Sequence, residues 1–128
     1  MGFEGDINAP FSHLLTLAGE EIEEARTALP EPLRESLDRV LVVLEEFPSG
    51  DFLADGVEQD QLGLFDGADA ADAANPSIPR IVLWLGNLWD MCGADEELYR
   101  EEVRITFLHE LGHYLGFGED DIAARGLD

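Results

Sequence analysis

The chain of 128 residues has the length of one domain with a single core, and 45% of its residues are hydrophobic. Twenty-nine acidic residues face seven basic ones, which gives a formal net charge of -22. This charge argues against binding to nucleic acids or to anionic membrane surfaces, which need a positive protein field, and it favours cationic peptides or divalent metal ions.

The cysteine count and the N-terminus predict the compartment. Cys92 is the single cysteine, so the chain can form no internal disulfide and a reducing compartment is expected. The first residues, MGFEGDINAP, lack the basic and apolar regions of a signal peptide, and no apolar run approaches the ~18 residues that span a bilayer. We therefore expect a soluble, cytoplasmic protein, and the acidic charge favours a monomer.

The first half of the chain predicts a helical start. Residues 1–10 are expected to form a flexible tail and residues 11–128 a single domain. Apolar residues recur at helical spacing from Phe11 to Leu29, with acids on the other face, and Pro30 ends the pattern. The following segment, PEPLRESL, predicts a short second helix with proline in its first turn.

Three segments predict strands of a small sheet. RVLVVLEEF, Arg39–Phe47, is rich in Val and Leu and is expected to be the central strand. LGLF, residues 62–65, predicts a short strand, and IPRIVLWL, residues 78–85, predicts a long one that offers an edge for an added peptide strand. Residues 66–77 are expected to form a solvated loop, because their Asp spacing does not match a calcium loop.

The longest helical pattern follows Gly93 and runs to about Leu115, with acids at residues 95–97 that suit a helix N-terminus. The short acidic segment 119–126 is expected to form a closing helix. The stripe of the long helix that faces the core is expected to consist of Leu98, Ile105, Leu108 and Leu115.

Two of the three histidines lie on this helix, within the stretch TFLHELGHYLGFGEDD. His109 and His113 are four residues apart, which places them ~400° around the helix axis and ~6 Å along it, so both imidazoles project from one face. Two such rings can converge on one zinc ion. Glu110 lies on the flank of the pair, where it can reach a water on the metal and act as general base for attack on an amide carbonyl.

A third ligand is expected from the segment after the helix. Gly116 can adopt the left-handed conformation that ends a helix and turns the chain back. Glu119 follows His113 by six residues and is the expected third ligand, with Asp120 and Asp121 as alternatives. No oxyanion donor is evident, although Tyr114, Tyr99 and His13 are candidates.

The motif HELGHYLGFGE resembles the extended zincin signature, with Glu119 at the position where metzincins have a third histidine. It resembles most the small bacterial zincin-like metallopeptidases, or minimal zincins, over roughly residues 9–126. The resemblance implies an α+β fold with a small β-sheet packed against an N-terminal helix and a long active-site helix. It also implies zinc ligands at His109, His113 and Glu119 and a catalytic Glu110. The methionine that underlies the metal in metzincins is missing here.

Three functions are compatible with these residues. The leading one is a zinc-dependent metallopeptidase that hydrolyses peptide or protein substrates, which the acidic charge suggests are cationic. The second is a non-catalytic module in which zinc stabilises a small structural or interaction domain, and the third is a metal-free acidic protein that binds a cationic partner. Trp84, Trp89 and Cys92 are expected to be core residues.

Overall fold

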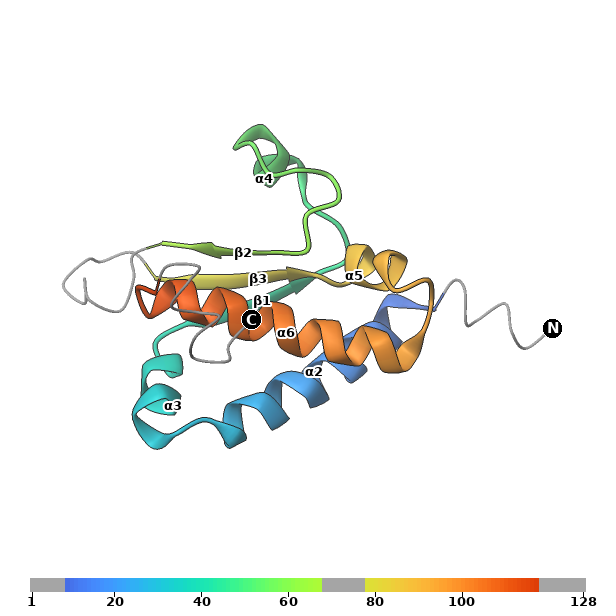
Figure 1. Cartoon of the computed structure of the whole chain (residues 1–128). Helices are drawn as coiled ribbons and strands as arrows, with labels where there is room; N and C mark the ends of the chain where they lie inside the picture. The colour runs from blue at the N-terminus through green and yellow to red at the C-terminus, as the bar shows by residue number, and fades with distance from the viewer. Residues whose placement is uncertain (1–8, 68–77, 118–128) are drawn as a thin grey trace.

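The computed structural model describes residues 9–67 and 78–117. It confirms a mixed α+β fold, in which helices surround a three-stranded sheet (Figure 1). No helix in these ranges is long and apolar enough to cross a membrane. The described elements, in chain order, are α2 (Phe11–Ala28), α3 (Glu31–Leu37), β1 (Leu41–Glu45), α4 (Gly50–Ala54), β2 (Gly63–Asp66), β3 (Arg80–Trp84), α5 (Leu85–Met91) and α6 (Glu96–Tyr114).

The sheet has the strand order β1-β3-β2. β1 pairs in parallel with β3, with Val43 opposite Val82, whereas β2 pairs antiparallel to β3, with Leu64 opposite Val82. The prediction that Arg39–Phe47 forms the central strand is therefore wrong, because β3 lies between the other two strands. For the same reason β3 offers no free edge to a peptide.

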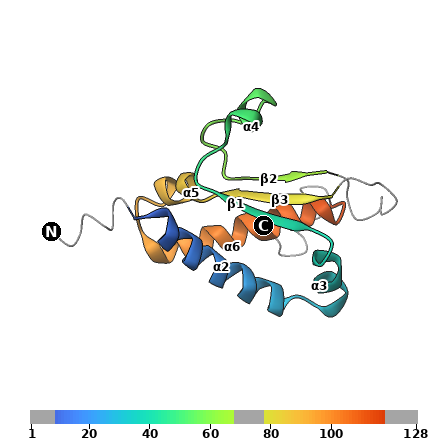
Figure 2. The ribbon, with the colours of Figure 1, turned by 180° about the vertical axis from the view of Figure 1, so that it is seen from behind.

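The helices α6 and α2 lie on one side of the sheet (Figures 1 and 2). α6 packs against β2 and β3, and α2 packs along α6. The Tyr99 hydroxyl, which is fully buried, donates a hydrogen bond of 2.9 Å to the Leu14 carbonyl and so joins the two helices inside the core. These contacts hold α6 against the sheet.

The predicted core stripe of α6 is correct only in part. Leu108 and Leu115 are partly buried and pack against the core, whereas Leu98 is 42% exposed and Ile105 is only partly buried. Tyr99 rather than Leu98 lies in the core, where its hydroxyl donates to the Leu14 carbonyl. The buried residues of α6 then recur at helical spacing. The buried members of the stripe are Tyr99, Val103, Phe107, Leu111 and Tyr114.

Two helices were missed by the sequence analysis. α5 begins directly after β3 and contains Gly86 and Asn87, residue types that commonly mark turns. A Cβ on Gly86 would lie 2.6 Å from the Phe47 ring and 2.7 Å from the Glu46 carbonyl oxygen, so this glycine serves a close contact. α4 lies on the opposite side of the sheet from α6, where the Phe52 ring packs on the edge of Trp84 with centroids 5.3 Å apart.

Three of the predicted segments fall wholly or partly outside the described ranges. The solvated loop was assigned to residues 66–77, of which 68–77 lie outside the description, whereas Asp66 belongs to β2. The flexible tail was assigned to residues 1–10, of which 1–8 lie outside the description, whereas Ala9 packs against the core. The closing helix at 119–126 lies entirely outside it.

Candidate metal centre

The C-terminal half of α6 carries His109, Glu110 and His113. The two imidazole rings face each other edge to face, with centroids 4.9 Å apart and planes at 77°. Both histidines are half-buried, so they stand at the surface of the core rather than in free solvent. The helix therefore holds both rings on one face, as the four-residue spacing predicted.

α6 ends in a hydrogen-bonded reversal of the chain at Gly116. The φ angle of this glycine is +85°, in the left-handed region. Its N–H donates to the His113 carbonyl and the Phe117 N–H donates to the Gly112 carbonyl, both at 3.0 Å, which is the pattern of a Schellman motif. The helix-ending role predicted for Gly116 is confirmed. The chain thus turns away from the helix axis three residues before Glu119.

The expected third ligand cannot be placed, because Glu119 and its alternatives Asp120 and Asp121 lie outside the described residues. Within residues 9–67 and 78–117, no three His, Cys, Asp or Glu side chains come together as a metal-binding group. Glu110 therefore does not complete a ligand set with the histidines.

The arrangement of the two histidines fits zinc. Two nitrogens that share one zinc ion at ~2.1 Å can be no more than about 4.2 Å apart, and rings with centroids 4.9 Å apart can satisfy this limit. Two imidazoles and one carboxylate form a known donor set for catalytic zinc that leaves a fourth position open. The described residues supply the two imidazoles of that set.

A pocket of about 440 Å³ opens between α6 and β2. One wall consists of His113 and Glu110, and the other of Leu64, Phe65 and Gly67 at the end of β2. His113 and Glu110 were predicted from the sequence as residues of a metal site, whereas the residues of β2 and Gly67 were not. The LGLF segment was predicted to form a strand, but its position beside α6 depends on the order of the strands in the sheet.

Close packing brings β2 against α6 near this pocket. A Cβ on Gly63 would lie 2.7 Å from Cγ2 of Thr106, which precedes His109 by one helical turn. At the other end of the strand, the rings of Phe65 and Tyr114 pack with centroids 5.6 Å apart. These two contacts fix the separation between the walls of the pocket.

The candidate oxyanion donors do not lie in this pocket. The Tyr99 hydroxyl is engaged with Leu14 inside the core. His13 lies on α2, with Nε2 3.6 Å from the Glu96 carboxylate at the start of α6. Tyr114 lines a different pocket, between α6 and α3.

Trp84, Trp89 and Cys92 are core residues, as predicted. Trp84 is fully buried and donates a 2.9 Å hydrogen bond from Nε1 to Glu45, while the Trp89 ring packs on the edge of Tyr99. None of the three lines the pocket at His113.

A family model described as zincin-like metallopeptidase matches residues 37–127, which is more than two thirds of the chain. The match includes β1, the whole sheet and α6 with both histidines. No curated protein matches the chain.

Proposed function

The chain belongs to the zincin-like metallopeptidase family, and from this membership we propose that it is a zinc-dependent peptidase. The observation that carries the proposal is the pair His109 and His113, whose rings lie 4.9 Å apart, with His113 lining the same pocket as Glu110. Family membership alone supports a peptidase-like protein, and the histidine geometry favours one that uses a metal.

His109 and His113 are proposed to hold zinc through ring nitrogens, with Glu119 as the third ligand. The reversal at Gly116 supports the third assignment, because it directs the chain back from the end of α6. Asp120 and Asp121 are the alternatives. Zinc, when bound, supplies the Lewis acidity that activates water and polarises an amide carbonyl.

Glu110 is proposed to act as the general base and acid. Its carboxylate would accept a proton from the attacking water and deliver that proton to the leaving nitrogen, which then departs as a neutral amine. The support is that Glu110 and His113 line the same pocket, as their separation of only ~60° around the helix axis allows. Such proton transfer typically contributes ~10²–10⁴-fold to the rate.

The substrate is proposed to be an extended peptide that pairs with β2. Among the described strands, β2 is bonded to β3 on one side only, and its residues Leu64 and Phe65 line the pocket. A peptide that adds as a further strand gains backbone hydrogen bonds and places alternate side chains against the pocket. The net charge of -22 favours cationic peptides.

We further propose that the protein acts as a monomer in the cytoplasm. The supporting observation is Cys92, a free and buried thiol that suits a reducing compartment. Light scattering tests the oligomeric state, and fractionation of native cells tests the compartment. A stable dimer, or protein found only outside the cytoplasm, would contradict this part of the proposal.

The metal assignment is tested by zinc titration of the purified chain. We expect one zinc ion per chain, and a loss of affinity of at least about tenfold in Glu119→Ala, because a lost ligand leaves the ion under-coordinated. Asp120→Ala and Asp121→Ala are the matched controls. If Asp120→Ala or Asp121→Ala loses zinc affinity and Glu119→Ala does not, that aspartate is the third ligand. If the wild type binds no zinc, the site is refuted.

The catalytic assignment is tested by Glu110→Gln. Glutamine keeps the shape of the side chain but cannot carry the proton, so cleavage of a peptide library by zinc-loaded protein should fall at least ~100-fold while zinc is retained. Glu101→Gln, at an exposed position on the same helix, is the control. If neither the wild type nor the variant cleaves peptides but both bind zinc, the protein is the non-catalytic zinc module.

A further inference from the structure

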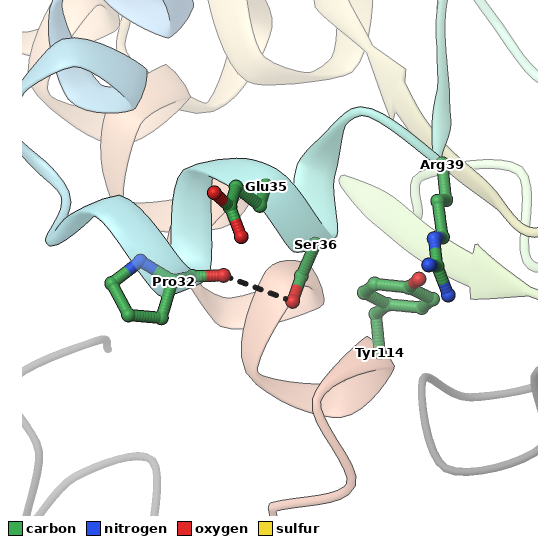
Figure 3. Close-up of a pocket in the computed structure, with 5 residues that line it drawn as sticks. All are labelled: Pro32, Glu35, Ser36, Arg39 and Tyr114. Carbon is green, nitrogen blue, oxygen red and sulfur yellow. Dashed lines mark hydrogen bonds between the residues drawn. The ribbon is translucent and has the colours of Figure 1, made fainter.

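A second pocket lies between α3 and the C-terminal end of α6, away from the wall formed by His113 (Figure 3). Its volume is about 180 Å³, which is room for about six water molecules at ~30 Å³ each. The pocket is lined by Pro32, Glu35, Ser36, Arg39 and Tyr114. Four of its five lining residues therefore carry a polar or charged group.

Tyr114 is the buried polar group of this pocket. Only 3% of the residue is exposed, and its ring packs on Phe65. Its hydroxyl makes no hydrogen bond within the described part of the chain. In that part, every side-chain nitrogen or oxygen atom that is fully buried has a hydrogen-bond partner, so an oxygen without one must be reached by solvent. The hydroxyl therefore opens into the pocket, as Figure 3 shows, and can donate to a ligand.

Arg39 supplies a cation to the same pocket. Its guanidinium has no ion pair with any residue in 9–67 or 78–117, whereas Arg26, Arg80 and Arg100 are each paired with acids. Figure 3 shows the guanidinium beside the end of the Tyr114 ring, and no hydrogen bond joins the two groups. An arginine and a phenol that face one space are suited to hold a carboxylate.

The opposite wall has the opposite chemistry. Glu35 carries a carboxylate, and Ser36 Oγ donates its proton to the Pro32 carbonyl at 3.2 Å, which leaves the lone pairs of the hydroxyl as acceptors. A simple anion would meet Glu35 and a chain of net charge -22. A ligand that also carries an ammonium group would satisfy both walls.

We propose that this pocket binds a small zwitterion of the α-amino acid class. The carboxylate of the ligand lies against Arg39 and Tyr114, and its ammonium group lies against Glu35 and Ser36. The site is separate from the proposed zinc site, and its occupation requires neither zinc nor peptide hydrolysis.

The test is calorimetric titration of the full chain with free L-leucine, N-acetyl-L-leucine and L-leucinamide. We expect saturable binding of leucine, and at least about tenfold weaker binding of each derivative, because each one lacks one of the two charges. Absence of leucine binding would overturn the proposal. Equal binding of all three compounds would also overturn it, since neither charge would then be recognised.

Variants locate the binding. Arg39→Gln and Tyr114→Phe should each weaken leucine binding by about tenfold or more, and the phenylalanine keeps the ring contact with Phe65. Arg34→Gln, on α3 but outside the pocket lining, should bind as the wild type does. Thermal unfolding verifies that each variant is folded. Unchanged affinity in both folded pocket variants would refute this location.

Discussion

Burial changes the acid chemistry of Cys92 at the scale of a single residue. The residue is 5% exposed, and burial raises the pKa of its thiol to about 11, with smaller contributions from the negative charges of Glu102 and Asp95. Folding therefore favours the neutral thiol. This contribution to stability is complete below about pH 8.5, the pKa of an exposed thiol, and it is lost as the pH rises through about 11.

We expect Cys92 to react slowly with iodoacetamide in the folded protein. Only the thiolate reacts, so at pH 8 a pKa of about 11 should make the reaction at least about 100-fold slower than in guanidinium-unfolded chain. Mass spectrometry of the alkylated protein measures both rates. Between pH 7 and 9.5 the folded rate should keep rising about tenfold per pH unit. If the alkylation rate of the folded protein levelled off near pH 8.5, the pKa of the Cys92 thiol would not be raised.

The residues of the candidate site differ in how far the sequence could predict them. The shared face of His109 and His113 and the positive φ of Gly116 follow from local helix geometry, and both are confirmed. The zinc ligands themselves remain a prediction. Phe65 and Gly67 were missed as pocket residues, because their place opposite His113 depends on a strand pairing between segments distant in the sequence.

At the scale of elements, Gly63 controls how closely β2 approaches α6. An added Cβ would lie 2.7 Å from Thr106 Cγ2, 3.1 Å from Leu83 Cδ2 and 3.2 Å from the Val82 carbonyl oxygen. Thr106 is 8% exposed and belongs to the packed interface. A side chain at this position must therefore displace the Thr106 side chain, the strand, or the helix that carries His109.

Gly63→Ala should lower the free energy of unfolding by ~1–3 kcal/mol, the usual cost of overpacking a core. Denaturant unfolding measures this change. Thr106→Ser removes the methyl group that the alanine would meet, so the double variant should be more stable than the sum of the two single changes predicts. Strict additivity of the two changes would show that this contact is not the source of the cost.

The matched control is Gly19→Ala, in α2, where a Cβ would meet nothing within 4 Å. Alanine there should raise the free energy of unfolding by up to ~1 kcal/mol through helix propensity. The two glycines would then respond with opposite sign to the same substitution, which separates a packing effect from a general property of glycine.

The elements also show which structural information is local. α2, α3, α6, β1 and β3 lie within the segments predicted from periodicity and proline positions, and β2 extends one residue beyond its predicted segment, to Asp66. The order of the strands was wrong because RVLVVLEEF and IPRIVLWL have similar apolar patterns, and only chain connectivity and packing place β3 in the centre. α5 was missed because Gly86 resembles a helix breaker, whereas its role is a contact with Phe47 from a distant segment.

Charge dominates at the scale of the whole molecule. Twenty-nine acidic residues and seven arginines give a net charge of -22, so repulsion between carboxylates opposes the compact state. A few ion pairs offset part of this repulsion, such as Arg100 with Glu20 at 2.6 Å between α6 and α2. These pairs are partly exposed, and exposed pairs typically contribute only ~0–1 kcal/mol each.

Salt should therefore stabilise the protein. Sodium chloride screens both the repulsion and the ion pairs, but the excess of acids makes the loss of repulsion the larger effect. We expect the thermal unfolding midpoint to rise as NaCl increases from about 10 mM to about 0.15 M, where the Debye length falls from ~30 to ~8 Å, and to change less beyond that. Circular dichroism at pH 7 measures the midpoint.

Arg100→Gln separates the two electrostatic effects. The variant loses the pairs with Glu20 and Glu21 and carries one more net negative charge, so its midpoint should be lower in dilute buffer and should rise more steeply with NaCl. Choline chloride, with a different cation, should act like NaCl if screening is the cause. A wild-type midpoint that falls with added salt would mean that specific ion pairs, rather than the overall charge, govern the stability of this fold.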